Sequence, residues 1–222
     1  MKKYLPFIIA GVMVVVGLVV FLLIKASVGG TPTATPEAVV PDLPQSEWPV
    51  VSLTPTSNPQ VPNSLGHWLD FKVQKLNVPG AVSMDYELVY NTTDGGQQGV
   101  PGTVKLDGTD VDRPLLLGSE SSGKFRYDAG VETGMMTLRF RDGSGKLIGK
   151  LTTNFHLQSN TVDLSSTDNN LKYTLAKLAK GVYFVTMQTF KDPDASMVVF
   201  TQNGYSIFAS DGKPHAGKVV AQ

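Results

Sequence analysis

The sequence has no cysteine and few histidines, and these absences exclude several kinds of chemistry. Without cysteine, the 222-residue chain has no disulfide framework, no thiol nucleophile, no thiolate metal site and no lipoprotein anchor. The histidines, His67, His156 and His215, share no metal-ligand spacing, and no Gly-x-Ser-x-Gly elbow occurs. The sequence therefore predicts no catalytic residue, no metal site and no cofactor, and we expect that the protein is not an enzyme.

The chain also lacks an excess of charge, with 19 basic and 19 acidic residues. Removing Lys2, Lys3 and Lys25, which flank a long apolar run, leaves 16 basic against 19 acidic residues, a net charge of −3. A nucleic-acid-binding surface would be basic. We therefore expect no nucleic-acid partner.

Two short motifs resemble ligand loops but lack the complete pattern. Asp107, Asp110 and Asp112 have no twelve-residue calcium frame with a terminal glutamate, and Asp and Gly at these positions are typical of turns. Gly143 to Lys146 lacks the remainder of a phosphate loop, since leucine follows the lysine. Neither motif predicts a ligand.

The long apolar run is Leu5 to Ile24, which is twenty residues without a charge. A helix of this length spans roughly 30 Å, the thickness of a bilayer core. Lys2 and Lys3 precede it, and after Lys25 the next basic residue is Lys72. This bias predicts a single span of the plasma membrane with the N-terminus in the cytoplasm and the C-terminal part outside.

A cleaved signal peptide is the alternative to this anchor. Its apolar region would be about 7–15 residues long and would end at small residues. Small residues do follow the run, at Ala26, Ser27, Gly29 and Gly30, so cleavage stays open. The greater length of the run favours an uncleaved anchor, with residues 1–25 forming the cytoplasmic tip and the transmembrane helix.

Proline dominates the next segment, because eight of the fourteen prolines lie between residues 26 and 66. Proline disfavours helices and central strands. Residues 26–47 are therefore predicted to form a Pro/Thr-rich extended stalk.

Residues 48–158 have the pattern of an all-β domain, with alternating apolar and polar residues and frequent turn signals. Val50 to Leu53 is predicted as an edge strand and Ala81 to Asn91 as the clearest strand. The glycine-rich segments Thr92 to Gly102 and Gly118 to Gly123 are predicted as loops. About eight strands between Val50 and Leu157 indicate an antiparallel immunoglobulin-like sandwich.

Residues 159–222 are predicted to form a β-rich subdomain docked on the sandwich, and extra strands on its sheet are the alternative. Leu171 to Lys180 fits a helix or a strand, turn and strand, and the second is favoured. Asn203-Gly204 between apolar runs is a hairpin signal.

The segments Tyr86 to Tyr90 and Leu178 to Val185, with QQGVPGTVKLDG and RYDAGVETGMMTLRFRDGSGKL, resemble uncharacterised membrane-anchored bacterial surface proteins. Their module is similar to immunoglobulin or fibronectin type III domains. The resemblance implies a fold and a location but no activity.

Loops on a rigid sandwich commonly carry binding. The residues predicted for partner contact are therefore Asp94, Gln97, Gln98, Glu120 and Ser121. We expect a structural or adhesion-like binding module at the cell surface, with a protein or an envelope glycan as partner. A subunit of a larger envelope or secretion assembly is the alternative. A glycan-binding module using Trp48 and Trp68, or an anchored hydrolase, is less favoured.

Overall fold

The computed structural model describes residues 42–220, and the predicted transmembrane helix at Leu5 to Ile24 lies outside this range, as do Lys2, Lys3 and Lys25. Among the described residues, none belongs to a helix with the length and apolar character needed to cross a membrane. The described chain is all-β, and every pairing between its strands is antiparallel.

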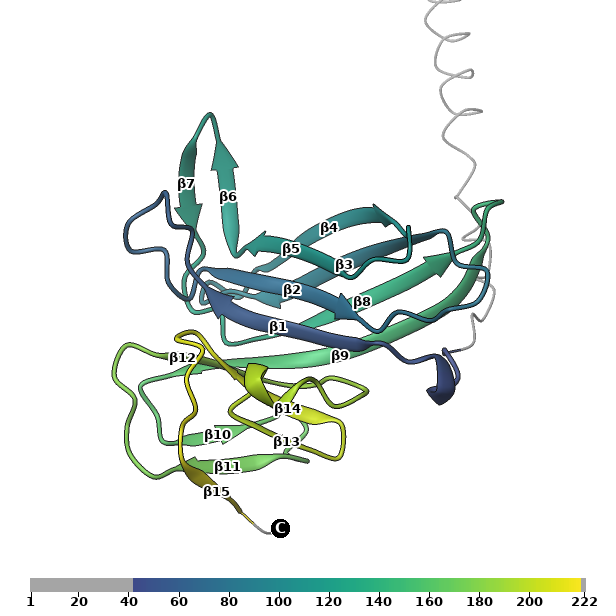
Figure 1. Ribbon diagram of the computed structural model, residues 1–222. Coiled ribbons are helices and arrows are strands. Elements are labelled where there is room, and N and C mark those ends of the chain that lie inside the picture. The colour runs from purple at the N-terminus through teal and green to yellow at the C-terminus, as the bar shows by residue number, and fades with distance from the viewer. Residues whose placement is uncertain (1–41, 221–222) are drawn as a thin grey trace, which may run out of the picture. The chain divides into compact units, whose positions relative to one another are not determined.

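The strands form two main sheets, a small third sheet and a separate hairpin (Figure 1). The first sheet has the order β1 (Val50–Thr56), β2 (Trp68–Gln74) and β5 (Val111–Leu116). The second has the order β13 (Phe200–Gln202), β14 (Tyr205–Ala209), β12 (Tyr183–Gln188), β9 (Leu147–Ser159), β8 (Thr133–Arg141), β3 (Ser83–Asn91) and β4 (Gln97–Lys105). The third contains β10 (Asp163–Ser165), β11 (Lys172–Leu175) and β15 (Gly217–Val219). The separate hairpin consists of β6 (Gly118–Ser121) and β7 (Lys124–Tyr127). Two short 3-10 turns, η1 (Gln45–Glu47) and η2 (Ala195–Met197), complete the described elements.

The two main sheets form a sandwich around one apolar core. Alternation along β2 buries Leu69, Phe71 and Val73 completely, while the residues between them are half-buried. From the second sheet, Met136 and Leu138 of β8 join the same core. This clear alternation explains why sequence periodicity predicts these strands correctly.

The end of the second sheet formed by β12 and β14 is covered on both faces. Val185 packs in the sandwich core, whereas its neighbour Phe184 packs in a second core with residues of β10 and β11. Burial on both faces gives β12 its continuous apolar sequence. The predicted strand, turn and strand after Leu171 is confirmed as β11 and β12, and the Asn203-Gly204 turn joins β13 to β14.

The second sheet continues through residue 159, where the sequence pattern changes. β9 pairs with β8 along its first part and with β12 over Phe155 to Ser159. The thirteen residues of β9 thus connect the sandwich to the C-terminal strands.

The chain enters the sandwich at one end. Leu43 is buried, its N–H donates to the Lys150 carbonyl at 3.2 Å, and its side chain lies over Gly149. The indole N–H of Trp48 donates to the Leu43 carbonyl at 2.8 Å. Asp42 and Leu43, within the predicted stalk, therefore lie against β9 before β1 begins at Val50.

Candidate functional site

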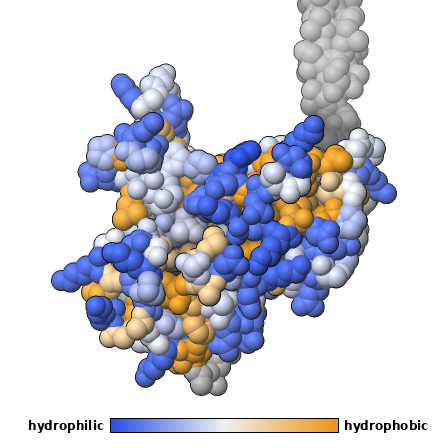
Figure 2. Space-filling model, viewed as in Figure 1, coloured by the Kyte–Doolittle hydropathy of each residue, from blue (hydrophilic) through white to orange (hydrophobic). Residues whose placement is uncertain are grey.

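The residues predicted for partner contact gather at the opposite end of the sandwich. β3 ends there, and Asp94 lies in the turn that joins it to β4. Gln97 and Gln98 begin β4, and Glu120 and Ser121 end β6, whose hairpin projects from the sandwich (Figure 1). In Figure 2 this hairpin carries mostly hydrophilic residues.

The two loop predictions are wrong over residues 97–102 and 118–121, which are strands, whereas residues 92–96 and 122–123 do connect strands. Tyr86 on β3 pairs with Gly102, and its ring occupies the space where a Cβ at Gly102 would lie. The neighbouring aromatic ring thus covers a glycine that in isolation favours a loop. Pro101 is tolerated because β4 is the edge strand of its sheet.

Asp94 is engaged in its own turn. Its carboxylate accepts hydrogen bonds from the Thr92 hydroxyl and from the Gly96 N–H. These hydrogen bonds, led by that of Thr92, lower the pKa of Asp94. The Thr93 N–H then donates to the Ala129 carbonyl at 3.0 Å, which ties the turn to the segment after β7. Asp94 therefore orders this end of the molecule.

The β6–β7 hairpin rests on aromatic residues at its base. Phe125 meets Trp68 edge-on with ring centroids 5.7 Å apart, and Tyr127 stacks on His67 at 4.4 Å. The other tryptophan, Trp48, packs against Phe190 at 5.3 Å. Both tryptophans are thus used in internal contacts.

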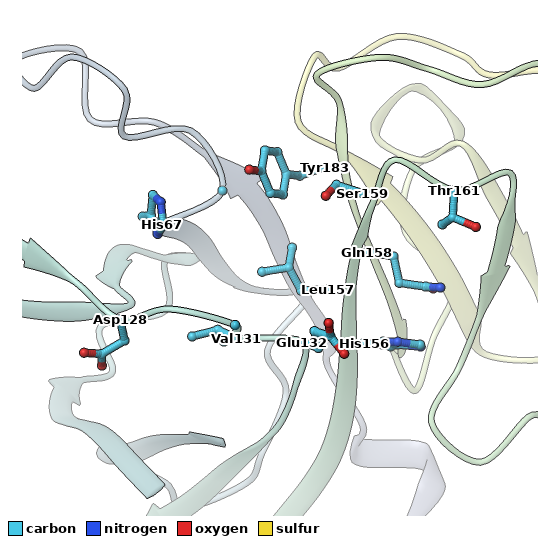
Figure 3. A pocket seen from close by; sticks show the side chains of 12 residues that line it. His67, Asp128, Val131, Glu132, His156, Leu157, Gln158, Ser159, Thr161 and Tyr183 are labelled. Carbon is cyan, nitrogen blue, oxygen red and sulfur yellow. The ribbon is translucent and has the colours of Figure 1, made fainter. Parts of the chain in front are cut away.

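A cleft of about 390 Å³ opens at the base of the hairpin (Figure 3). His67, Asp128 and Tyr183 line the cleft on one side of β9, and His156 and Gln158 line it on the other (Figure 3). The two imidazoles therefore do not converge.

Two polar side chains of the cleft, Asp128 and His156, have structural partners. The Asp128 carboxylate accepts the Tyr90 hydroxyl at 2.9 Å, and burial together with this carboxylate raises the pKa of Tyr90. His156 Nδ1 lies 2.8 Å from the Ser165 carbonyl, so this nitrogen carries the proton and donates it. The Ser165 hydroxyl also lies 3.5 Å from His156 Nδ1, but a nitrogen that donates its proton to the Ser165 carbonyl cannot serve as a base toward this hydroxyl.

Burial lowers the pKa of His67 below its ordinary value of 6.5. The unfolded chain then binds a proton more readily than the folded chain, so stability should fall as the pH drops below about 6.5. We expect His67→Phe, which keeps a ring against Tyr127, to weaken this decline. Urea unfolding at pH 7 and pH 5 gives the free energy of unfolding at each pH. If this free energy falls as much in the variant as in the parent, His67 is not the cause of the decline.

The acidic motif of residues 107–112 serves as a turn and an ion-pair anchor. Asp107 accepts the Thr109 N–H at 3.0 Å, Asp110 accepts the Lys75 N–H at 3.3 Å, and Asp112 lies 2.9 Å from Lys72 Nζ. Within residues 42–220, no three His, Asp or Glu side chains are grouped to hold a metal. The third histidine, His215, has its Nε2 3.0 Å from Asp211.

Sequence reasoning missed a second hollow, of about 420 Å³, on the outer face of the second sheet. Asn91, Gln97 and Asn154 line it with Met135 and Asp168. These residues come from β3, β4, β9, β8 and the β10–β11 turn. Gln97 was predicted for partner contact. The signal for Asn91, Met135 and Asn154 was only their place on the outward face of their strands, and Asp168 lies in a polar turn.

Comparisons with family models, curated proteins and solved structures give no match.

Proposed function

We propose that the protein is a single-pass, membrane-anchored β-sandwich module that faces outward and has a structural or binding role at the cell surface. The observation that carries the proposal is the difference between the two ends of the sandwich. The chain enters beside Leu43 and Val50, and the projecting hairpin, the Asp94 turn and the cleft of Figure 3 lie toward the other end. A module held at one end offers its opposite end to a partner.

We further propose that the sandwich is immunoglobulin-like, in keeping with the surface proteins that the sequence resembles. In support, the strand order β1-β2-β5 opposite β9-β8-β3-β4 matches the A-B-E and G-F-C-C′ arrangement of that class. The β6–β7 hairpin is then an insertion between the fifth strand of the sandwich and the sixth.

A subunit of an envelope assembly, the alternative role, would contact other subunits through the edge strand near Val50. Val50 and Val51 are buried, and the Val51 N–H donates to the Thr189 carbonyl at 3.2 Å. This strand is therefore largely occupied within the chain. The observation favours display of the opposite end over assembly through β1.

Single-cysteine labelling tests the orientation, because the native chain has no cysteine. Ser121→Cys places a thiol on the exposed hairpin, and Lys3→Cys is the matched control before the apolar run. We expect a membrane-impermeant maleimide to label Ser121→Cys in intact spheroplasts and Lys3→Cys only after lysis. Protection of Ser121→Cys in spheroplasts, or release of the protein from membranes by carbonate, would overturn the proposal.

A further inference from the structure

The hollow on the outer face of the second sheet combines unused amide groups with an apolar floor. Asn91, Gln97 and Asn154 are exposed, and their side chains make no hydrogen bond to any residue between 42 and 220. Met135 between them is 39% exposed, one of the few large apolar side chains so exposed in this range. Each amide supplies two N–H donors and one carbonyl acceptor.

Strand register brings these groups together from distant parts of the sequence. Asn91 pairs with Gln97 across β3 and β4, and Met135 pairs with Asn154 across β8 and β9. Val89 pairs with Met135 and extends the apolar floor. Since β3 and β8 are neighbours, the amides surround an apolar strip on one continuous sheet face.

The β10–β11 turn forms a fixed wall of the hollow. Asp168 accepts hydrogen bonds from the Ser166 hydroxyl at 2.6 Å and from the Asn170 N–H at 3.0 Å. The Tyr205 hydroxyl also donates to this carboxylate, so the turn is held to β14. Burial acts to raise the pKa of Asp168, but these hydrogen bonds outweigh it and lower the pKa. The wall is therefore ordered and negatively charged at neutral pH.

We propose that this hollow, defined by Asn91, Gln97, Met135, Asn154 and Asp168, binds a neutral glycan. Each sugar hydroxyl both donates and accepts, which matches the paired donor and acceptor of an amide. The C–H faces of a sugar ring fit the apolar strip of Val89 and Met135. The volume of about 420 Å³ lies within the range of small-ligand sites, roughly 300–1,000 Å³.

Other ligand classes fit this hollow less well. Its lining contains no Lys or Arg and one carboxylate, which disfavours nucleic acids and acidic sugars. A peptide strand would add along the free edge of β4, whereas the hollow lies on the face of the sheet, over β3, β8 and β9, which already pair with their neighbours. This inference rests on the proposed surface role and names the ligand class that such a module would contact.

The test uses the full ¹⁵N-labelled chain in detergent micelles. The probes are neutral pentasaccharides of glucose, mannose and N-acetylglucosamine, with pentagalacturonate and a Gly/Ser peptide as contrasts. We expect a neutral pentasaccharide to shift the side-chain amide signals of Asn91, Gln97 and Asn154. Loss of one hydrogen bond corresponds to about fivefold in affinity, so Gln97→Ala and Asn154→Ala should each weaken binding by about that factor.

Thr152→Ala is the matched control, because Thr152 lies two residues before Asn154 on the same exposed face of β9 and outside the hollow. It should leave the affinity unchanged. The inference is overturned if no neutral pentasaccharide binds at about 10 mM, if only pentagalacturonate or the peptide binds, or if Asn154→Ala behaves like Thr152→Ala. Failure here leaves the orientation result of Ser121→Cys untouched, and an inward-facing Ser121→Cys refutes the surface role whatever the saccharide data show.

Discussion

Phe155→Ala is expected to lower the free energy of unfolding by about 3–5 kcal/mol, the range for removing a buried aromatic ring from a core. Phe155 is completely buried near the middle of β9. Across the sheet it pairs with Gly134 of β8 on one side and with Met187 of β12 on the other. The substitution would leave a cavity where the sandwich joins the C-terminal strands.

The fit of this ring explains why the cavity should remain open. A Cβ at Gly134 would lie 2.5 Å from the Phe155 ring, so the ring lies directly against the glycine backbone. No side chain at position 134 can move into the space. Because the backbone there is held by pairing to β3 and β9, relaxation should be small.

Urea unfolding followed by Trp48 and Trp68 fluorescence measures the loss. Thr152→Ala on the exposed face of the same strand is the control and should stay within about 0.5 kcal/mol of the parent. Hydrogen exchange should accelerate in β8 and β12 together, because Phe155 contacts both. A loss below about 1 kcal/mol, or faster exchange in only one of these strands, would mean that β9 does not couple the two parts.

The sequence predicts strands well where one face is buried and the other is exposed. In β2 and β8, apolar residues alternate because a single sandwich core takes every second side chain. The Asn203-Gly204 turn is similarly local, since Asn203 and Gly204 both adopt positive φ. Such features depend on neighbours in the sequence and can be read without knowing the fold.

Features that depend on distant contacts could not be predicted in this way. The glycines of β4 indicate a loop, and only the ring of Tyr86 on the adjacent strand makes Gly102 a strand residue. Likewise, alternation places Asn154 on the polar face of β9 but does not identify its neighbours. The register of β3, β4, β8 and β9 brings the amides together. The β10–β11 turn, which completes the lining of the hollow, comes from a polar segment whose sequence gives no sign of this contact.

Gly118→Ala is expected to detach the β6–β7 hairpin from its base. Gly118 has φ +153°, and an added Cβ would lie 2.1 Å from the Arg126 carbonyl oxygen and 3.0 Å from the Tyr127 Cα. Both atoms belong to the backbone of the paired strand, so no rotamer change relieves the contact. Strained backbone and overpacking each cost about 1–3 kcal/mol, which gives a loss of about 2–6 kcal/mol.

The loss should be local, because the hairpin forms a two-stranded sheet of its own. Opening its base would separate Tyr127 from His67 and Phe125 from Trp68. Trypsin should then cleave after Lys124 and Arg126 at least about tenfold faster, since cleavage follows the population of the open form. Mass spectrometry of timed digests measures the rate at each bond.

Gly123→Ala separates the contact at Gly118 from the general cost of replacing a glycine in this hairpin. Gly123 also has a positive φ, of +76°, but lies at the tip, where no atom comes within 4 Å of an added Cβ. It should cost about 1 kcal/mol and change cleavage by only a few fold. Equal acceleration in the two variants would show that backbone strain alone controls the hairpin. Faster cleavage in Gly118→Ala alone would identify the contact with Arg126 as what holds the projecting hairpin in register.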